Sequence, residues 1–206
     1  MKKIILLSFF LILSIQVLQA QSIFIKSGRN LTNYKFGNAT DESPLLQNEI
    51  GQSYEFGYIS NQLLKNRFSF GLSLGLEEYN ASGGQYSTNV LVWETNYANL
   101  KGLGYFRLYS NEKSSFAIKG GLGLATLIHG RQQINGARFD LLKQEEFKGL
   151  FLAPQLGLSY NFSIDNGMSL LLDYDYGRQF SLTNRTEQKL SFINHSLSLG
   201  FSVNIN

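Results

Sequence analysis

The clearest pattern in the chain is the strict alternation of residues 68–76, FSFGLSLGL, where every second residue is large and apolar and the others are serine or glycine. Successive side chains of a β-strand point to opposite faces, so this stretch predicts a strand with one apolar face and one small or polar face. In a soluble sandwich the apolar face would point inward. Later stretches repeat the alternation with charged residues on the small face, which favours a barrel with lipid outside and a polar interior.

The same alternation predicts eight strands along the chain. We expect them at residues 22–36, 53–60, 67–77, 90–109, 115–129, 150–162, 168–177 and 192–206. Their connections alternate between long loops, at residues 37–52, 80–88, 130–149 and 178–191, and short links, at residues 61–66, 110–114 and 163–167. Transmembrane barrels have this rhythm, with short periplasmic turns, longer extracellular loops and an even number of strands. The sequence therefore predicts an all-β fold, an eight-stranded antiparallel up-and-down transmembrane β-barrel, and the alternative is a soluble sandwich or lipocalin-like barrel.

Charged residues of both signs fall on the predicted inner face. A lysine or arginine that faced lipid near the bilayer centre would cost about 2–4 kcal/mol, so charge decides which face points inward. An eight-stranded barrel has an interior just wide enough for side chains to fill, and buried charges are tolerated when they pair. We predict a salt-bridged plug, with a small gated channel as the alternative. The expected lumen charges are Lys26, Glu55, Glu77, Lys101, Arg107, Lys119, Asp173 and Asp175.

Arg29 departs from this rule because it shares the apolar face of its strand with Ile23, Ile25 and Leu31. An arginine at mid-bilayer on this face would be costly. We therefore expect either a bulge in the strand or a position of Arg29 near the rim of the barrel.

Aromatic residues gather near the predicted strand ends. Tyrosine and phenylalanine rings at the lipid boundary form the aromatic girdles of membrane barrels. The alternative is the ordinary preference of aromatic residues for strands. The expected girdle residues are Tyr54, Tyr58, Tyr97, Tyr109, Phe116, Tyr160, Phe162, Tyr174 and Tyr176.

The chain begins with a secretory signal. Lys2 and Lys3 precede an apolar run, and Ala20 stands where a signal peptidase cleaves. The run is shorter than the roughly 20 residues that a spanning helix needs, which disfavours an uncleaved anchor. We predict a signal peptide at residues 1–20 and a single barrel domain at residues 21–206.

Several segments resemble a known group of proteins. They are the signal peptide ending in Ala20 before Gln21, FIKSGRNLTNYKFG (residues 24–37), YANLKGLGYFRLY (residues 97–109) and GLFLAPQLGLSYNFSIDNGMSLLLDYDYG (residues 149–177). Over nearly the whole mature chain they are similar to the small outer-membrane β-barrel domain proteins labelled porin family, whose architecture is that of OmpA and OmpX. The resemblance implies a barrel in the outer membrane of a Gram-negative cell, and it does not imply transport. Many such barrels end in an aromatic residue, whereas the last aromatic residue here is Phe201.

The composition excludes several classes of site. There are no cysteines, hence no disulfides and no thiolate metal sites. Loss of Lys2 and Lys3 with the signal peptide reduces the 18 basic residues to 16 against 15 acidic residues, and no basic run suggests nucleic acid. No paired histidine or carboxylate motif has metal-ligand spacing. We therefore expect no cofactor, no metal and no nucleic-acid partner.

The two histidines are the candidates for catalysis. Some eight-stranded outer-membrane barrels modify lipid A with a histidine, a serine and a carboxylate at the lipid boundary. His195 falls on the predicted outer face, whereas Ser196 and Ser198 fall on the inner face, and His129 has no partner readable from spacing. We therefore expect no catalytic residues and no enzyme, with a lipid A-modifying activity as the alternative.

The long loops offer the remaining surface for binding. They would cluster at the outer end of a rigid scaffold, as binding loops do. The most distinctive segment, RFDLLKQEEF at residues 138–147, could dock a partner or fold over the barrel mouth. The sequence thus predicts a monomeric structural or surface-interaction scaffold that contacts outer-membrane lipid and lipopolysaccharide, with a possible extracellular partner at the loops.

Overall fold

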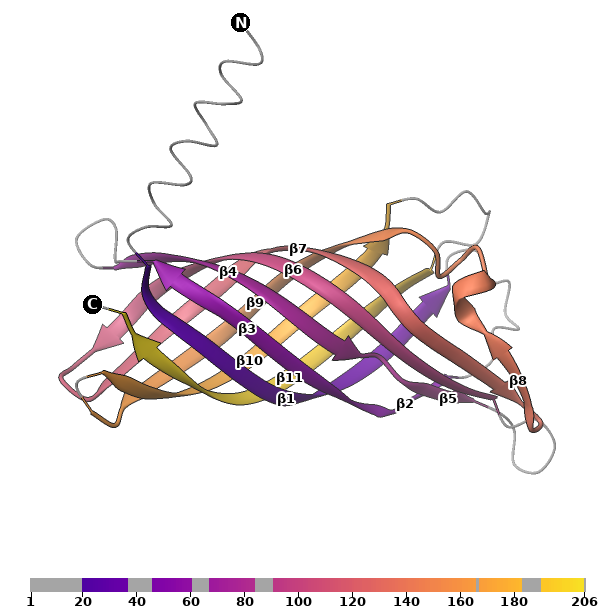
Figure 1. Ribbon diagram of the computed structural model, residues 1–206, viewed down its shortest axis with the longest axis horizontal. Helices are drawn as coiled ribbons and strands as arrows, with labels where there is room; N and C mark the ends of the chain where they lie inside the picture. Colours follow the sequence, from indigo (N-terminus) through magenta and orange to yellow (C-terminus); the bar gives the residue numbers. More distant parts are fainter. Residues whose placement is uncertain are drawn as a thin grey trace, which may run out of the picture.

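Eight antiparallel strands form a closed ring in the computed structural model, which describes residues 20–36, 46–60, 67–83, 91–165, 167–182 and 190–205 (Figure 1). Each strand pairs with the next along the chain, and the last closes on the first. The predicted fold class is therefore confirmed. The ring strands are β1 (Ala20–Phe36), β3 (Ile50–Ser60), β4 (Phe68–Glu78), β6 (Leu91–Ser110), β7 (Ser114–Ile134), β9 (Leu150–Ser163), β10 (Met168–Ser181) and β11 (Leu190–Asn204).

One end of the barrel holds the short turns together with the start of β1 and the end of β11 (Figure 1). Ser22 pairs with Asn204 there. The backbone N–H of Asn204 also donates to the carbonyl of Gly167, in the turn between β9 and β10. The side chain of Asn111 closes the β6–β7 turn by accepting from the backbone N–H of Ser114 at 2.6 Å. This is the arrangement expected at the periplasmic end. The predicted link at residues 61–66 and residues 1–19 of the predicted signal peptide lie outside the described residues.

The opposite end extends further than the sequence predicts. Parts of the expected long loops are strand, because the pairing of β6 with β7 continues as far as Leu91 and Ile134. Residues 131–140 of this projecting part are exposed or only partly buried, so they show no apolar alternation that would reveal a strand. The described residues contain no helix with the length and apolar character needed to cross a membrane. The additional elements at this end are β2 (Leu46–Asn48), β5 (Ala81–Gly83), β8 (Ala137–Asp140) and the 3-10 helix η1 (Leu141–Lys143), while residues 37–45, 84–90 and 183–189 of the expected loops lie outside the described residues.

The two faces of the wall differ in chemistry, as the alternation requires. Outward leucines such as Leu74 and Leu156 are 61% and 65% exposed, whereas Lys26 on the inner face is 3% exposed. A water-soluble protein would not present such a continuous apolar exterior. The outer wall is therefore the hydrocarbon-facing surface of a membrane barrel.

Arg29 lies exposed on this outer wall. The register of β1 runs unbroken through Arg29 against both β3 and β11, so there is no bulge at this residue. Asn33, four residues further along the same face of β1, is also exposed. Arg29 therefore lies at the outer margin of the apolar wall. Of the two expectations, a bulge or a position near the rim of the barrel, the structure agrees with the second.

Candidate functional site

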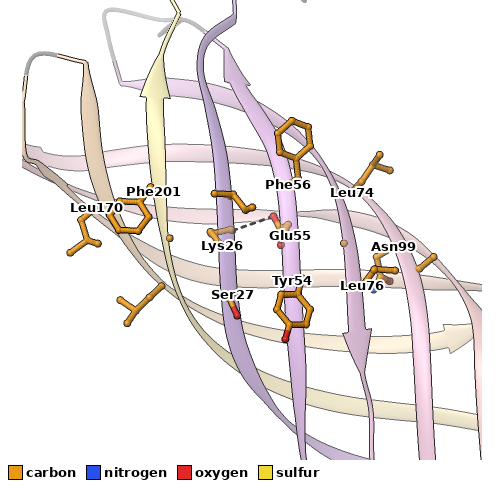
Figure 2. Close-up of a pocket in the computed structure, with 15 residues that line it drawn as sticks. Lys26, Ser27, Tyr54, Glu55, Phe56, Leu74, Leu76, Asn99, Leu170 and Phe201 are labelled. Atoms are coloured by element: carbon orange, nitrogen blue, oxygen red, sulfur yellow. Dashed lines mark ion pairs between the residues drawn. The ribbon is translucent and has the colours of Figure 1, made fainter.

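A continuous line of charges that alternate in sign fills the middle of the barrel. Its order is Glu77, Lys101, Glu55, Lys26, Asp173, Lys119 and Asp175. We call these seven side chains the charge network. Each lysine bridges two carboxylates, and Figure 2 shows one such pair, between Lys26 on β1 and Glu55 on β3. The structure thus brings together seven of the eight charges that the sequence assigns to the lumen.

The distances within the charge network are those of charge-assisted hydrogen bonds. Lys26 Nζ and Lys119 Nζ both donate to Asp173 Oδ2 at 2.7 Å. Lys119 also donates to Asp175 Oδ2 at 2.8 Å, and Lys101 donates to Glu77 Oε1 at 2.5 Å. The longest contact joins Lys26 Nζ and Glu55 Oε1 at 3.2 Å.

Neutral side chains donate further hydrogen bonds to two of the carboxylates, those of Asp173 and Glu77. Ser159 Oγ donates to Asp173 Oδ1 at 2.6 Å, and Asn99 Nδ2 donates to Glu77 Oε2 at 2.8 Å. The hydroxyl of Tyr79 donates to the same oxygen of Glu77. Since Lys119 and Asp173 are only 1% and 2% exposed, these partners are needed to offset the loss of hydration.

Gly157 allows Lys119 to reach Asp175. The residue pairs with Lys119 on β7 and with Asp175 on β10, so it lies between the two charges on the inner face. A Cβ atom at this position would lie 2.6 Å from Asp175 Oδ1 and 2.9 Å from Lys119 Cε. Glycine is therefore required here by close approach.

Little open space remains among these charges. The cavity bordered by Lys26, Glu55, Lys101 and Asp175 has a volume of about 10 Å³. A cavity of this size accommodates one water molecule at most. At the level of the charge network the interior is filled.

Arg107 is the predicted lumen charge that the structure keeps apart from the network. It lies six residues beyond Lys101 on β6, roughly 20 Å along the strand toward the periplasmic end. There it borders a hollow of about 140 Å³ together with Tyr105, Ser69 and Asn204. None of the described carboxylates forms an ion pair with Arg107, because the acidic residues of the inner face lie further up the barrel.

A second filling, which the sequence analysis missed, closes the barrel above the charge network. It consists of buried aromatic rings, which we call the aromatic plug: Tyr34, Tyr79, Trp93, Tyr97, Phe147, Phe151 and Phe192. Phe192 is fully buried and packs against the rings of Tyr34, Tyr79, Tyr97 and Phe151, at centroid distances of 4.7–5.9 Å.

The prediction that Tyr97 faces lipid is wrong. We expected it in the lipid-facing girdle, but it is 0% exposed inside the barrel. The signal was present in the sequence, since Tyr97 has the same strand parity as the inward Asn99 and Lys101. Other expected girdle residues, among them Tyr54 and Tyr176, are exposed on the outer wall.

A hydrogen bond joins Tyr34 on β1 to the backbone that follows β4, at the outer end of the barrel. The hydroxyl of Tyr34 donates to the carbonyl of Tyr79 at 2.8 Å. The plug is thus held by directional bonds as well as by packing.

The distinctive segment at residues 138–147 folds onto the aromatic plug. Leu141 and Phe147 are buried, and the Phe147 ring meets the Trp93 ring edge-on at 5.3 Å. Phe139 and Leu142 of the same segment stay exposed. Of the two expected uses of this segment, folding over the mouth is the one that the contacts show.

The histidines lie outside the barrel interior. His195 Nδ1 is hydrogen-bonded to the Tyr174 hydroxyl at 2.8 Å on the outer wall, whereas Ser196 and Ser198 are buried on the inner face. His129 borders an outer hollow of about 310 Å³ whose lining contains no serine. In the described part of the chain, no three histidine, aspartate or glutamate side chains are placed to hold a metal ion.

Comparisons with known proteins identify the fold. No family model and no curated protein sequence matches the chain. Among solved structures, Neisserial surface protein A (NspA) matches with a TM-score of 0.54 and 9% identity over 89% of this chain and 97% of its own. Ail of Yersinia pestis matches at 0.45 and 14% over 89% and 99%, and the N-terminal β-barrel domain of OprF from Pseudomonas aeruginosa at 0.45 and 10% over 90% and 98%.

At such low identities the likeness to NspA concerns the fold and not the function. The fold agrees with the chemistry of the two faces, since the wall is apolar outside and charged inside. A closed ring of eight antiparallel strands with this polarity spans the outer membrane. The chain is a small β-barrel protein of the cell outer membrane.

Proposed function

We propose that the protein is a closed barrel that serves as a structural element and surface-interaction scaffold of the outer membrane. The observation that supports this is the filled interior, with the charge network in the middle and the aromatic plug above it. An ion that crossed the barrel would have to separate buried pairs such as Lys26–Asp173 and Lys119–Asp173, both at 2.7 Å. Separating a buried pair leaves an uncompensated charge, which is strongly unfavourable.

Conductance measurements test the closed state. The purified protein, shown to be folded by its heat-modifiable migration in gels, is expected to give no stepwise currents in planar bilayers. Stepwise currents whose size changes in Lys101→Gln would contradict the proposal and favour the gated channel. The lipid-facing variant Phe106→Ala is the control, because it changes no residue of the interior.

Exposed apolar side chains at the outer end of the barrel support the proposed role as a surface-interaction scaffold. The β7–β8 hairpin and η1 project beyond the ring, where they expose Phe139 and Leu142 at 48% and 40%. Apolar side chains held on a rigid hairpin are suited to contact a protein outside the cell. In this proposal the barrel acts as a monomer that is surrounded by outer-membrane lipid and lipopolysaccharide.

We expect no lipid A-modifying activity. His195 has tyrosines and no serine or carboxylate as its described neighbours on the outer wall, and His129 borders a hollow without a serine. Cells that produce the native protein, His195→Ala or His129→Ala are expected to show the same lipid A acylation by mass spectrometry. A change in acylation that depends on the native protein and disappears in either variant would instead establish the enzyme alternative.

A further inference from the structure

An apolar groove of about 710 Å³ crosses the outer wall from β10 over β11, β1, β3 and β4 to β6 (Figure 2). Its volume lies within the range of small-molecule binding pockets. The large apolar and aromatic side chains that line it include Ile25, Tyr54, Phe56, Leu74, Leu199 and Phe201. We call it the wall groove.

Small outward side chains create the wall groove. Ser27 lies directly between Leu199 on β11 and Tyr54 on β3, so a short side chain is flanked by two large ones. Ala98 leaves a similar gap beside Leu76. A second hollow, of about 340 Å³, shares Phe56 and Leu74 with the wall groove and continues it toward the periplasmic end.

A cation lies just beyond the lining of the wall groove, on the side of the outer end. Arg29 follows Ser27 by two residues on the same face of β1 and is exposed. Arg29 forms no ion pair with any described residue. The outward carboxylate in this region, Glu78, instead accepts from the backbone N–H of Gln52 at 3.0 Å.

Other polar groups accompany Arg29 at this level. The Tyr54 hydroxyl donates to Gln52 Oε1 at 2.5 Å, and Gln52 is the β3 partner of Arg29. On β11, Leu197 is the partner of Arg29, which places His195 diagonally from it at about 7–8 Å between Cα atoms. A charged and polar margin thus borders an apolar groove, which is the polarity of a lipid with an anionic headgroup.

The position of Arg29 along the barrel indicates which leaflet of the membrane would supply the lipid. β1 starts at the periplasmic end, where Ser22 pairs with Asn204, and Arg29 lies further along β1 toward the loop end. The wall groove therefore descends from Arg29 into the hydrocarbon in the direction in which the acyl chains of an outer-leaflet lipid point. The phosphate-bearing lipid of that leaflet is lipid A.

We propose that Arg29 and the wall groove bind one molecule of lipid A, with a phosphate on the Arg29 guanidinium and an acyl chain along Ser27, Tyr54 and Leu199. A guanidinium matches the planar, bidentate geometry of a phosphate. The acyl chain fills a space that the side chains of the wall leave open. This site is on the outside of the barrel and does not depend on whether the interior conducts ions.

Titration of the detergent-purified barrel with diphosphorylated lipid A, followed by native mass spectrometry, tests the proposal. Arg29→Gln is expected to weaken binding of the first lipid A molecule about tenfold or more, as loss of hydrogen bonds to a charged group implies. Ser27→Phe, which fills the wall groove and leaves Arg29 in place, is expected to weaken it as well. Dephosphorylated lipid A is expected to bind the native protein as weakly as diphosphorylated lipid A binds Arg29→Gln.

Arg178→Gln is the matched control, because it removes an exposed arginine that packs over the Phe180 ring and lies on β10 eight residues beyond Leu170, the residue of that strand that lines the wall groove. Its affinity for lipid A is expected to equal that of the native protein. An equal loss in Arg178→Gln and Arg29→Gln would overturn the proposal in favour of general charge attraction. Equally tight, Arg29-dependent binding of phosphatidylglycerol would overturn the assignment to lipid A.

Discussion

Asp173→Ala is expected to lower the free energy of unfolding by roughly 3–5 kcal/mol, the cost of breaking a buried ion pair by removing one partner. Asp173 Oδ2 accepts from both Lys26 and Lys119 at 2.7 Å, and all three side chains are at most 3% exposed. Without this carboxylate the two ammonium groups face each other across the barrel. Lys26 then retains Glu55, and Lys119 retains Asp175, but neither replaces the lost bond.

Equilibrium unfolding in urea from phospholipid vesicles, with heat-modifiable migration as a second probe of the folded state, measures this effect. Glu112→Ala is the control, because Glu112 is an exposed carboxylate in the β6–β7 turn, and it is expected to change stability by less than about 0.5 kcal/mol. If Asp173→Ala unfolded at the same urea concentration as the native protein, the charge network would not be a stabilising feature of the interior.

The position of a residue in the charge network is expected to determine how much stability is lost when that residue is removed. Asp175 is the end of the line and contacts Lys119, which still has Asp173 when Asp175 is removed. Its side chain is also more exposed, at 13% against 2% for Asp173. Removal of Asp173 therefore leaves two lysines with one carboxylate each, whereas removal of the terminal Asp175 leaves only one lysine in that state. This asymmetry follows from the linear order of the seven groups.

Much of this arrangement could be predicted because strand parity is a local property of the sequence. Lys26, Lys101 and Lys119 each fall on one parity of a strand whose other parity carries isoleucine or leucine, and the cost of a charge in lipid decides which of the two faces points inward. Which lysine meets which carboxylate could not be predicted, since it depends on the stagger of the strands around the ring. Arg107 has the same parity as Lys101, yet it lies too far along β6 to reach the network.

The aromatic plug was missed for a different reason. Its members come from strand ends such as Tyr97 and from the segment with Phe147, which were interpreted as girdle and loop. At the outer end the chain leaves the bilayer, so apolar residues no longer mark the lipid face and the alternation loses its meaning. What closes the barrel there is long-range packing between rings from different strands.

Phe192→Ala is expected to destabilise the barrel by roughly 3–5 kcal/mol, as removal of a buried phenylalanine does. Phe192 is fully buried at the centre of the aromatic plug, with Tyr79 at 4.7 Å and Tyr34 at 5.1 Å between ring centroids. The space left by its ring cannot be refilled by backbone movement, because the strands around it are fixed in a closed ring. Trp93, the one tryptophan of the chain, also packs against Tyr34 and so reports on the plug by fluorescence.

The matched control is Phe106→Ala on the outer wall of β6, where the side chain is 46% exposed. Its ring lies against lipid in both the native and the variant environment, and lipid tails are themselves apolar, so its loss is expected to cost clearly less. In Phe192→Ala the Trp93 emission should shift to longer wavelength as water enters the outer end, while in Phe106→Ala it should not. Equal destabilisation by the two substitutions would mean that the rings inside the barrel contribute no more to stability than rings in lipid, and the charge network would then be the part of the filled interior that stabilises the barrel.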